Sequence, residues 1–214
     1  MAFKAVIWDF GGVISSSPFD AFNAYEAERG LPKDFIRSVN ARNGDTNAWA
    51  LLERSEVTAA EFDRLFQAEA EALGHTVPGK DVLALLSGRL RPRVVAALKA
   101  CKAHGKVGCI TNNAPIGKGA GMTEDDGKAA EIAEVFALFD HVIESSKLGI
   151  RKPDPRIYTL MCEALGVSPE HCVYLDDLGI NLKPARAMGM TTIKVTGEDQ
   201  LLAELSEATG YALT

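Results

Sequence analysis

The sequence has few cysteines, and none is spaced for a disulfide framework or a zinc site. The 214-residue chain contains four, Cys101, Cys109, Cys162 and Cys172, and no two of them form a Cys-x-x-Cys motif. Disulfide scaffolds and structural zinc sites are therefore not expected. The four thiols are expected to be small buried apolar side chains. Cysteines kept as thiols fit a reducing, cytoplasmic location, which we therefore expect.

The chain also lacks an excess of positive charge. It has 23 Lys and Arg against 29 Asp and Glu, a formal net charge of -6. Binding to a nucleic-acid backbone requires a basic surface, so no nucleic-acid partner is expected. A small phosphorylated ligand remains compatible with this composition, because it needs positive charge only locally.

No apolar run is long enough to span a membrane. The first apolar run, residues 5–8, is interrupted by Asp9 and lacks the small-residue cleavage pattern of a signal peptide. We therefore expect no membrane association. Hydrophobic residues make up 47% and charged residues 24% of the chain, which is ordinary for a globular protein.

A nucleotide-binding loop is absent as well. Residues 116–127 contain glycines and a lysine after an expected strand, but they lack the Gly-Lys-Ser/Thr ending that supplies a hydroxyl ligand for magnesium. This segment is expected to be a mobile surface loop.

Strand-like alternation is missing between residues 19 and 73. Apolar residues recur there at helical spacing, which predicts helices at 19–29, 33–40, 49–54 and 58–73. Thr58 and Glu61 form a capping-box sequence that marks the start of the last of these. An ordinary crossover between parallel strands takes about a dozen residues or somewhat more. Residues 15–89 are therefore predicted to be an inserted helical cap.

From residue 90 onward, helical and strand patterns alternate. Helices are expected at 92–104, 128–136, 156–165, 181–188 and 199–209, and strands at 106–111, 141–145, 172–176 and 191–195. Such alternation indicates a parallel sheet with helices on both faces. The predicted fold class is α/β, a doubly wound parallel sheet formed by residues 1–14 and 90–214, with the all-helical cap inserted.

The most informative segment is the first strand, which ends on a lone carboxylate, Asp9, followed by Gly11 and Gly12. The carboxyl end of a buried strand is where open α/β sheets bind ligands. Glycines there allow a tight turn and a close approach of backbone to ligand. This segment therefore predicts a reaction centre.

Three further segments follow in a fixed order. Thr111 and Asn112 end the second strand, Lys152 precedes a proline-defined helix start, and Asp176 and Asp177 end a later strand. Together with Asp9 they resemble the signature of the haloacid dehalogenase superfamily. Residues 144–149, 152–155 and 175–186 also resemble the amino-terminal phosphatase domain of soluble epoxide hydrolase.

This resemblance implies a Rossmann-like core and a hydrolase of phosphoric monoesters. In the family the first strand carries the nucleophile, the second strand a Ser or Thr, and the next segment a Lys. Asp9, Thr111 and Lys152 are therefore the expected catalytic residues. The expected reaction passes through an aspartyl phosphate on Asp9, and the expected partner is a small phosphorylated substrate. Its phosphoryl group is expected to be bound by Thr111, Asn112, Lys152, Gly11 and Gly12.

A phosphate monoester repels a carboxylate nucleophile unless a cation offsets the charge. Magnesium prefers oxygen ligands and takes one or two carboxylates from a protein, and Asp9 and Asp177, with or without Asp176, meet that need. The resemblance adds the backbone carbonyl of Gly11. The expected cofactor is thus Mg²⁺, held by Asp9, Gly11, Asp176 and Asp177.

One departure from the family pattern keeps alternatives open. Phosphatases of this family usually carry a second Asp, a general acid/base, where this chain has Gly11. The alternatives are a 2-haloacid dehalogenase that uses Asp9 without metal, a phosphonatase with Lys33 or Lys80 of the cap as its Schiff-base lysine, and a catalytically weak phosphate-binding module. Substrate choice is expected to depend on the cap, with residues 15–19, residues 43–45 and Trp49 as candidates.

Overall fold

Residues 3–213 are described by the computed structural model, and a five-stranded parallel sheet forms their centre. The strand order is β3-β2-β1-β4-β5. The strands are β1 (Ala5–Trp8), β2 (Lys106–Thr111), β3 (His141–Glu144), β4 (Cys172–Asp176) and β5 (Thr191–Lys194). All residues of β1 and β4 are buried, as expected when helices cover both faces of a parallel sheet. This confirms the α/β fold class.

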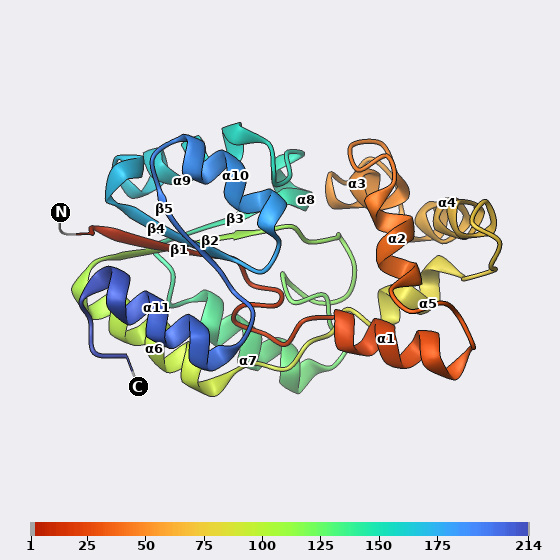
Figure 1. Cartoon of the computed structure of the whole chain (residues 1–214), viewed down its shortest axis with the longest axis horizontal. Helices are drawn as coiled ribbons and strands as arrows, with labels where there is room; N and C mark the ends of the chain where they lie inside the picture. The colour runs from red at the N-terminus through yellow and green to blue at the C-terminus, as the bar shows by residue number, and fades with distance from the viewer. Residues whose placement is uncertain (1–2, 214) are drawn as a thin grey trace.

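Helices cover the sheet on both faces (Figure 1). One face carries α6 (Pro92–His104), α7 (Asp126–Phe136) and α11 (Glu198–Thr209), and the other carries α9 (Pro155–Leu165) and α10 (Gly179–Ala187). Each face has its own apolar cluster, built around Trp8 and Leu98 on the first and around Ile7 and Tyr158 on the second. The sheet is therefore the middle layer of three.

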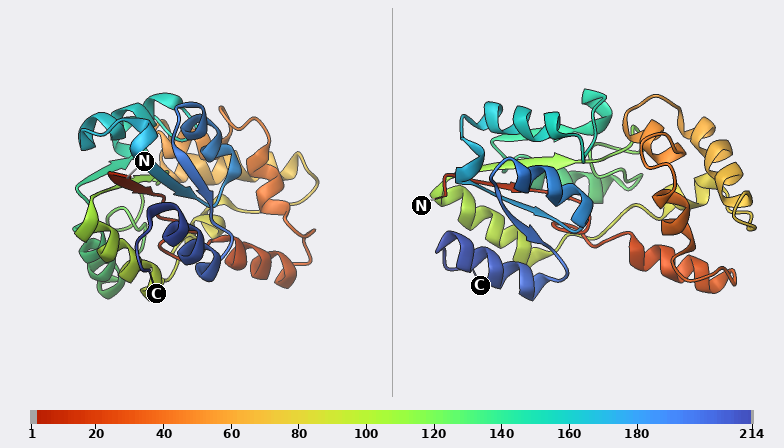
Figure 2. Two further views of the ribbon diagram at one scale, coloured as in Figure 1. Left: turned by 60° about the vertical axis from the view of Figure 1, so that its left-hand side comes forward. Right: turned by 45° about the horizontal axis from the view of Figure 1, so that its top comes forward.

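Six helices lie between β1 and β2 in the sequence, and we call the first five of them the cap helices. They are α1 (Phe19–Glu28), α2 (Phe35–Ala41), α3 (Ala48–Glu53), α4 (Ala59–Glu71) and α5 (Gly79–Ala84). They gather beyond the carboxyl ends of the strands (Figures 1 and 2). A separate apolar cluster holds them together, with Phe62 and Phe66 of α4 fully buried and Trp49 against the Phe62 ring.

The two connections between the sheet and the cap helices run side by side. Ser15 and Leu90 form an antiparallel bridge, and Ser16 N donates to the carbonyl of Arg89 over 2.8 Å. The domain boundaries at residues 14/15 and 89/90 stay a prediction, which this pairing supports. No helix among residues 3–213 combines the length and hydropathy that crossing a membrane requires.

All the predicted helices and strands are present within residues 3–213, with ends shifted by at most two residues. Thr58 caps α4 as predicted: Glu61 N donates to its hydroxyl over 3.2 Å, and Thr58 N donates to the Glu61 carboxylate over 2.8 Å. Three short elements were not predicted, namely α5, α8 (Ser145–Leu148) and a 3-10 turn (Pro169–His171). Elements of fewer than two turns give only a weak periodicity, which was recognised for α3 but not for these three.

The loop between β2 and α7 joins the cap helices to the sheet. Ala114 is buried within the cap cluster, and Ile116 and Met122 pack against it. Pro115, Gly117 and Lys118 are exposed. The segment of residues 116–127 is therefore only in part an exposed loop, because its side chains Ile116 and Met122 pack against the cap helices.

Candidate active site

Asp9 lies at the carboxyl end of β1, and only 7% of its surface is exposed. Its backbone N–H donates to the carbonyl of Leu175 in β4 over 2.9 Å. The Oδ1 atom accepts a hydrogen bond from Phe10 N at 2.6 Å and lies 2.8 Å from Lys152 Nζ. No described residue donates a hydrogen bond to Oδ2. One carboxylate oxygen is thus held in place and the other is free.

Lys152 is a buried cation placed between two carboxylates. Its Nζ lies 2.8 Å from Asp9 Oδ1 and 2.9 Å from Asp176 Oδ2, and the residue is 1% exposed. The Asn112 side chain fixes the backbone at this position: Lys152 N donates to Asn112 Oδ1 over 2.9 Å, and Asn112 Nδ2 donates to the Lys152 carbonyl over 3.0 Å. The end of β2 therefore positions the lysine.

Asp176 ends β4 and is fully buried, with both carboxylate oxygens hydrogen-bonded. Oδ1 accepts from Leu178 N at 2.8 Å and from Asn181 Nδ2 at 3.0 Å. Oδ2 accepts from Tyr174 Oη at 2.5 Å and from Lys152 Nζ at 2.9 Å. Donors this numerous stabilise an ionised carboxylate in a buried place. Asp176 is therefore a fixed counter-charge to the lysine.

The Asp177 carboxylate differs from that of Asp176 in its hydrogen bonding. No side-chain hydrogen bond to its carboxylate is present within residues 3–213. The carboxylate packs against Gly12, where an added Cβ would lie 2.2 Å from Asp177 Oδ2. Gly12 also has a φ of 76°, which favours glycine. Only glycine at this position leaves room for the Asp177 carboxylate.

The three carboxylates form the one group of His, Cys, Asp and Glu side chains in the described part of the chain that is arranged to hold a metal ion. Asp9, Asp176 and Asp177 each offer an oxygen, and these oxygens lie within 4.8 Å of one another. When all are ionised, three negative charges face the one positive charge of Lys152, a net charge of -2. An all-oxygen donor set with this charge suits a hard divalent cation such as Mg²⁺.

The pKa shifts show that burial and mutual repulsion make the ionised forms of Asp9 and Asp177 unfavourable. Burial raises the pKa of Asp9 well above its usual value, Asp176 and Asp177 raise it further, and Lys152 only partly opposes them. Burial, together with Asp176, raises the pKa of Asp177 to about 6. For Lys152, burial lowers the pKa, but the carboxylates of Asp176 and Asp9 outweigh it and keep the lysine charged.

The remaining predicted residues lie at the same edge of the sheet. Thr111 is the last residue of β2, next to β1, and is 4% exposed. Asn112 follows it and clamps Lys152. An added Cβ at Gly11 would meet no atom within 4 Å, so this position has room for a side chain. Because parallel strands place their carboxyl ends at one edge, the sequence order was enough to predict this grouping.

Sequence reasoning missed the residues that support Asp176. Tyr174 Oη donates to Asp176, Asn181 Nδ2 donates to it, and Tyr158 Oη donates to the Asn181 carbonyl over 2.7 Å. The Tyr158 and Tyr174 rings meet edge to face, with centroids 5.3 Å apart. One signal was present: residues two apart on a strand point to the same face, which places Tyr174 beside Asp176.

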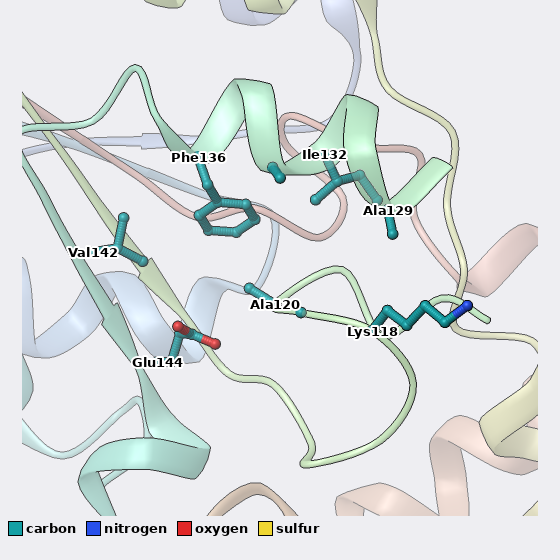
Figure 3. Close-up of a pocket in the computed structure, with 9 residues that line it drawn as sticks. Lys118, Ala120, Ala129, Ile132, Phe136, Val142 and Glu144 are labelled. Atoms are coloured by element: carbon teal, nitrogen blue, oxygen red, sulfur yellow. The ribbon is translucent and has the colours of Figure 1, made fainter. Parts of the chain in front are cut away.

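A hollow of about 240 Å³ lies away from this cluster, between α7, β3 and the β2–α7 loop (Figure 3). Ile132 and Phe136 of α7 and Val142 of β3 line it, with Glu144 and Lys118 at its edges. Both charged groups are already paired, Glu144 with Lys147 and Lys118 with Asp126. The hollow offers no free cation for a phosphoryl group, so the candidate site is the cluster at the end of the sheet.

The fold and this cluster agree with the comparison of the sequence with known families. Residues 3–189 match the model of the haloacid dehalogenase-like hydrolase family. The chain belongs to this family and is a hydrolase.

The sequence of the chain is similar to those of an epoxide hydrolase and of a phosphatase. It is 31% identical to bifunctional epoxide hydrolase 2 of Mus musculus over 98% of its own length, but it spans only 39% of that protein. It is 32% identical to phosphatase MT3486 of Mycobacterium tuberculosis, with 94% of this chain and 90% of that one covered. The resemblance to the haloacid dehalogenase superfamily and to the amino-terminal phosphatase domain of soluble epoxide hydrolase is confirmed.

Among solved structures, the chain resembles the wild-type HAD family enzyme bt-2542 of Bacteroides thetaiotaomicron, which was crystallised with magnesium and inorganic phosphate. The TM-score is 0.60 at 20% sequence identity, with 92% of this chain and 97% of that one covered. At this identity the likeness establishes the fold alone.

Proposed function

We propose that this hydrolase is a magnesium-dependent phosphatase of a small phosphorylated metabolite, with Asp9 as the nucleophile. The observation that carries the proposal is the cluster of Asp9, Asp176 and Asp177 around Lys152. Three carboxylates with one lysine keep a net negative charge that a divalent cation would offset. The free thiols of all four cysteines also fit the cytoplasmic location predicted from composition.

The hydrogen bonds divide the two neighbouring acids into different roles. Both oxygens of Asp176 are occupied by donors, so we assign it to holding Lys152. The Asp177 carboxylate has no such donor and faces Gly12, so we assign Asp177 and Asp9 as the direct protein ligands of Mg²⁺, with the carbonyl of Gly11. When bound, the cation would neutralise charge on the phosphoryl oxygens.

The Asp9 carboxylate is fixed through Oδ1, and Oδ2 is the oxygen that can act as the nucleophile. Phe10 N and Lys152 Nζ both bind Oδ1, which leaves Oδ2 free to attack phosphorus in line. The bond from Oδ2 to phosphorus forms as the bond to the leaving oxygen of the ester breaks, and water then hydrolyses the aspartyl phosphate to release phosphate. Lys152 is also a fixed positive charge for the phosphoryl oxygens, and fixed charges supply most of the catalysis in phosphoryl transfer. The Thr111 hydroxyl and the Asn112 backbone N–H would donate to a nonbridging oxygen.

Because Gly11 stands where phosphatases of the family usually carry a second Asp, no carboxylic acid at this position can protonate the leaving group. General acid/base catalysis typically contributes about 10²- to 10⁴-fold in rate. The proposed enzyme therefore favours substrates whose leaving group departs easily, such as aryl phosphates.

The test is hydrolysis of an aryl phosphate by wild type and by Asp9→Asn. We expect turnover in the wild type with Mg²⁺, and none in the variant or after chelation of the metal. Turnover by folded Asp9→Asn at the wild-type rate would contradict the proposal. Chloride release from 2-chloropropionate in the absence of metal would instead favour a dehalogenase. Tight phosphate binding without any turnover would favour a binding module.

A further inference from the structure

The cap helices are tied to the sheet next to the buried lysine. Arg151 Nε donates to Glu53 Oε2 over 2.6 Å, and Arg151 Nη1 donates to the carbonyl of Gly44 over 2.7 Å. Glu53 is the last residue of α3, and Gly44 lies in the turn that precedes this helix. The next residue along the chain is Lys152, which binds Asp9. Two adjacent residues thus bind the cap and the candidate site.

The Arg151–Glu53 ion pair is shielded from water on most of its surface. The two side chains are 22% and 15% exposed. Burial raises the pKa of Glu53, although the guanidinium of Arg151 opposes this shift. A planar guanidinium that donates to two acceptors also fixes orientation, which a lysine ammonium does not. The pair is therefore a directional contact, unlike a solvated surface ion pair, which contributes little.

A second hydrogen bond joins the same two regions. Ser55 Oγ donates to the carbonyl of Ser146 in α8 over 2.6 Å. Figure 1 shows α3 and α8 next to each other, and the two helices are in contact. The segment from Ser146 to Lys152 is therefore held by α3 on one side and by Asn112 on the other.

We propose that Arg151 and Glu53 are specificity-determining positioning residues. Their ion pair fixes α3 against the loop that carries Lys152, and so sets the space available to the leaving group of a phosphate ester bound at Asp9. Neither residue touches the reacting atoms; both act through the position of the cap. The inference rests on the proposed phosphatase function for its substrate, and it concerns only the part of the substrate beyond the phosphoryl group.

The experiment compares phenyl phosphate with 1-naphthyl phosphate, two esters that differ mainly in the size of the leaving group. In Glu53→Gln and in Arg151→Gln we expect the ratio of kcat/KM for the two esters to change about tenfold, the size typical when a pocket wall changes its contact with part of a substrate. Inhibition by inorganic phosphate should stay unchanged, because phosphate has no leaving group. The double variant should change the ratio no further than either single variant.

Glu56→Gln is the matched control. It removes an ion pair of similar length, Arg54 to Glu56 at 2.7 Å, that lies within the cap region and does not reach the sheet. We expect the ratio of the two esters to be unchanged in this variant. Arg151→Lys keeps the charge but loses the planar guanidinium that spans the two acceptors. Its ratio should therefore lie between those of wild type and Arg151→Gln, and the retained charge lowers the risk of misfolding.

Amide hydrogen exchange tests the contact without any turnover. Exchange in α3 and in residues 146–151 should be faster in Glu53→Gln than in Glu56→Gln. Unchanged exchange with an unchanged ester ratio overturns the inference, and so does an equal loss of activity on both esters accompanied by weaker phosphate inhibition. If the wild type hydrolyses no phosphate ester, the proposed function fails, and the exchange result alone decides whether the pair positions the cap.

Discussion

Replacing Asp177 by asparagine should stabilise the metal-free protein at neutral pH. The pKa of Asp177 is raised from 3.8 to about 6, first by burial and then by Asp176. A folded-state pKa above the unfolded one gives a contribution to stability that is complete below about pH 4 and is lost as pH rises through about 6. At pH 7.5 the ionised carboxylate therefore destabilises the fold.

The shift of about two pKa units corresponds to at most about 3 kcal/mol. Asparagine has nearly the same shape and cannot ionise, so Asp177→Asn should recover most of this free energy of unfolding at pH 7.5. For a chain of this size, about 3 kcal/mol corresponds to a rise in Tm of about 6–12 °C. The difference between variant and wild type should disappear toward pH 4, where both side chains are uncharged.

The assay is thermal unfolding of both proteins in a chelator, across pH 4 to 8, followed by addition of Mg²⁺ at pH 7.5. A ligand that binds only the folded state raises its stability, so Mg²⁺ should raise the Tm of the wild type and have little effect on Asp177→Asn. Asp45→Asn, which changes an exposed carboxylate, should match the wild type throughout. A lower Tm for Asp177→Asn at pH 7.5 in the chelator, or an equal response to Mg²⁺, would refute this account of the site.

Two further substitutions test the glycines after Asp9. Gly11→Asp has room for its side chain and should raise turnover of alkyl phosphates by about 10²-fold or more, with a smaller effect on aryl phosphates; an unchanged alkyl-to-aryl ratio of rates in the folded variant would contradict the role assigned to the missing acid. Gly12→Ala places a Cβ 2.2 Å from Asp177 Oδ2 at a φ of 76°, so it should lower stability by about 1–3 kcal/mol and weaken Mg²⁺ binding. Mg²⁺ titrations monitored by Tm would show this loss, whereas Gly11→Ala should bind Mg²⁺ as the wild type does.

The sheet and most helices could be predicted because their signals are local. The buried strands are short apolar runs, and the capping box at Thr58 marks a helix start within four residues. The short helix α5 and the contact of Ile116 with the cap cluster could not be predicted. A helix of six residues gives only a weak periodicity, and a loop side chain finds its neighbours only after the chain has folded.

The candidate site was predicted as a set of residues but not as a set of contacts. The order of Asp9, Thr111, Lys152, Asp176 and Asp177 along the chain resembles the family signature, and this resemblance grouped them. The sequence could not tell the two adjacent acids apart. Only the structure shows Asp176 with both oxygens occupied and Asp177 facing Gly12 without a side-chain donor.

The sequence by itself determined the α/β class, the helical insertion after the first strand and the edge of the sheet at which the acids and Lys152 gather. The fold follows from periodicity and the place of the acids from where each strand ends, both properties of neighbouring residues, whereas Lys152 was grouped with the acids by the family resemblance. Tertiary structure alone decided that Arg151 binds Glu53, which lies 98 residues earlier in the chain. Such contacts depend on how separate elements pack, because a side chain pairs with whichever group the fold brings within hydrogen-bonding distance.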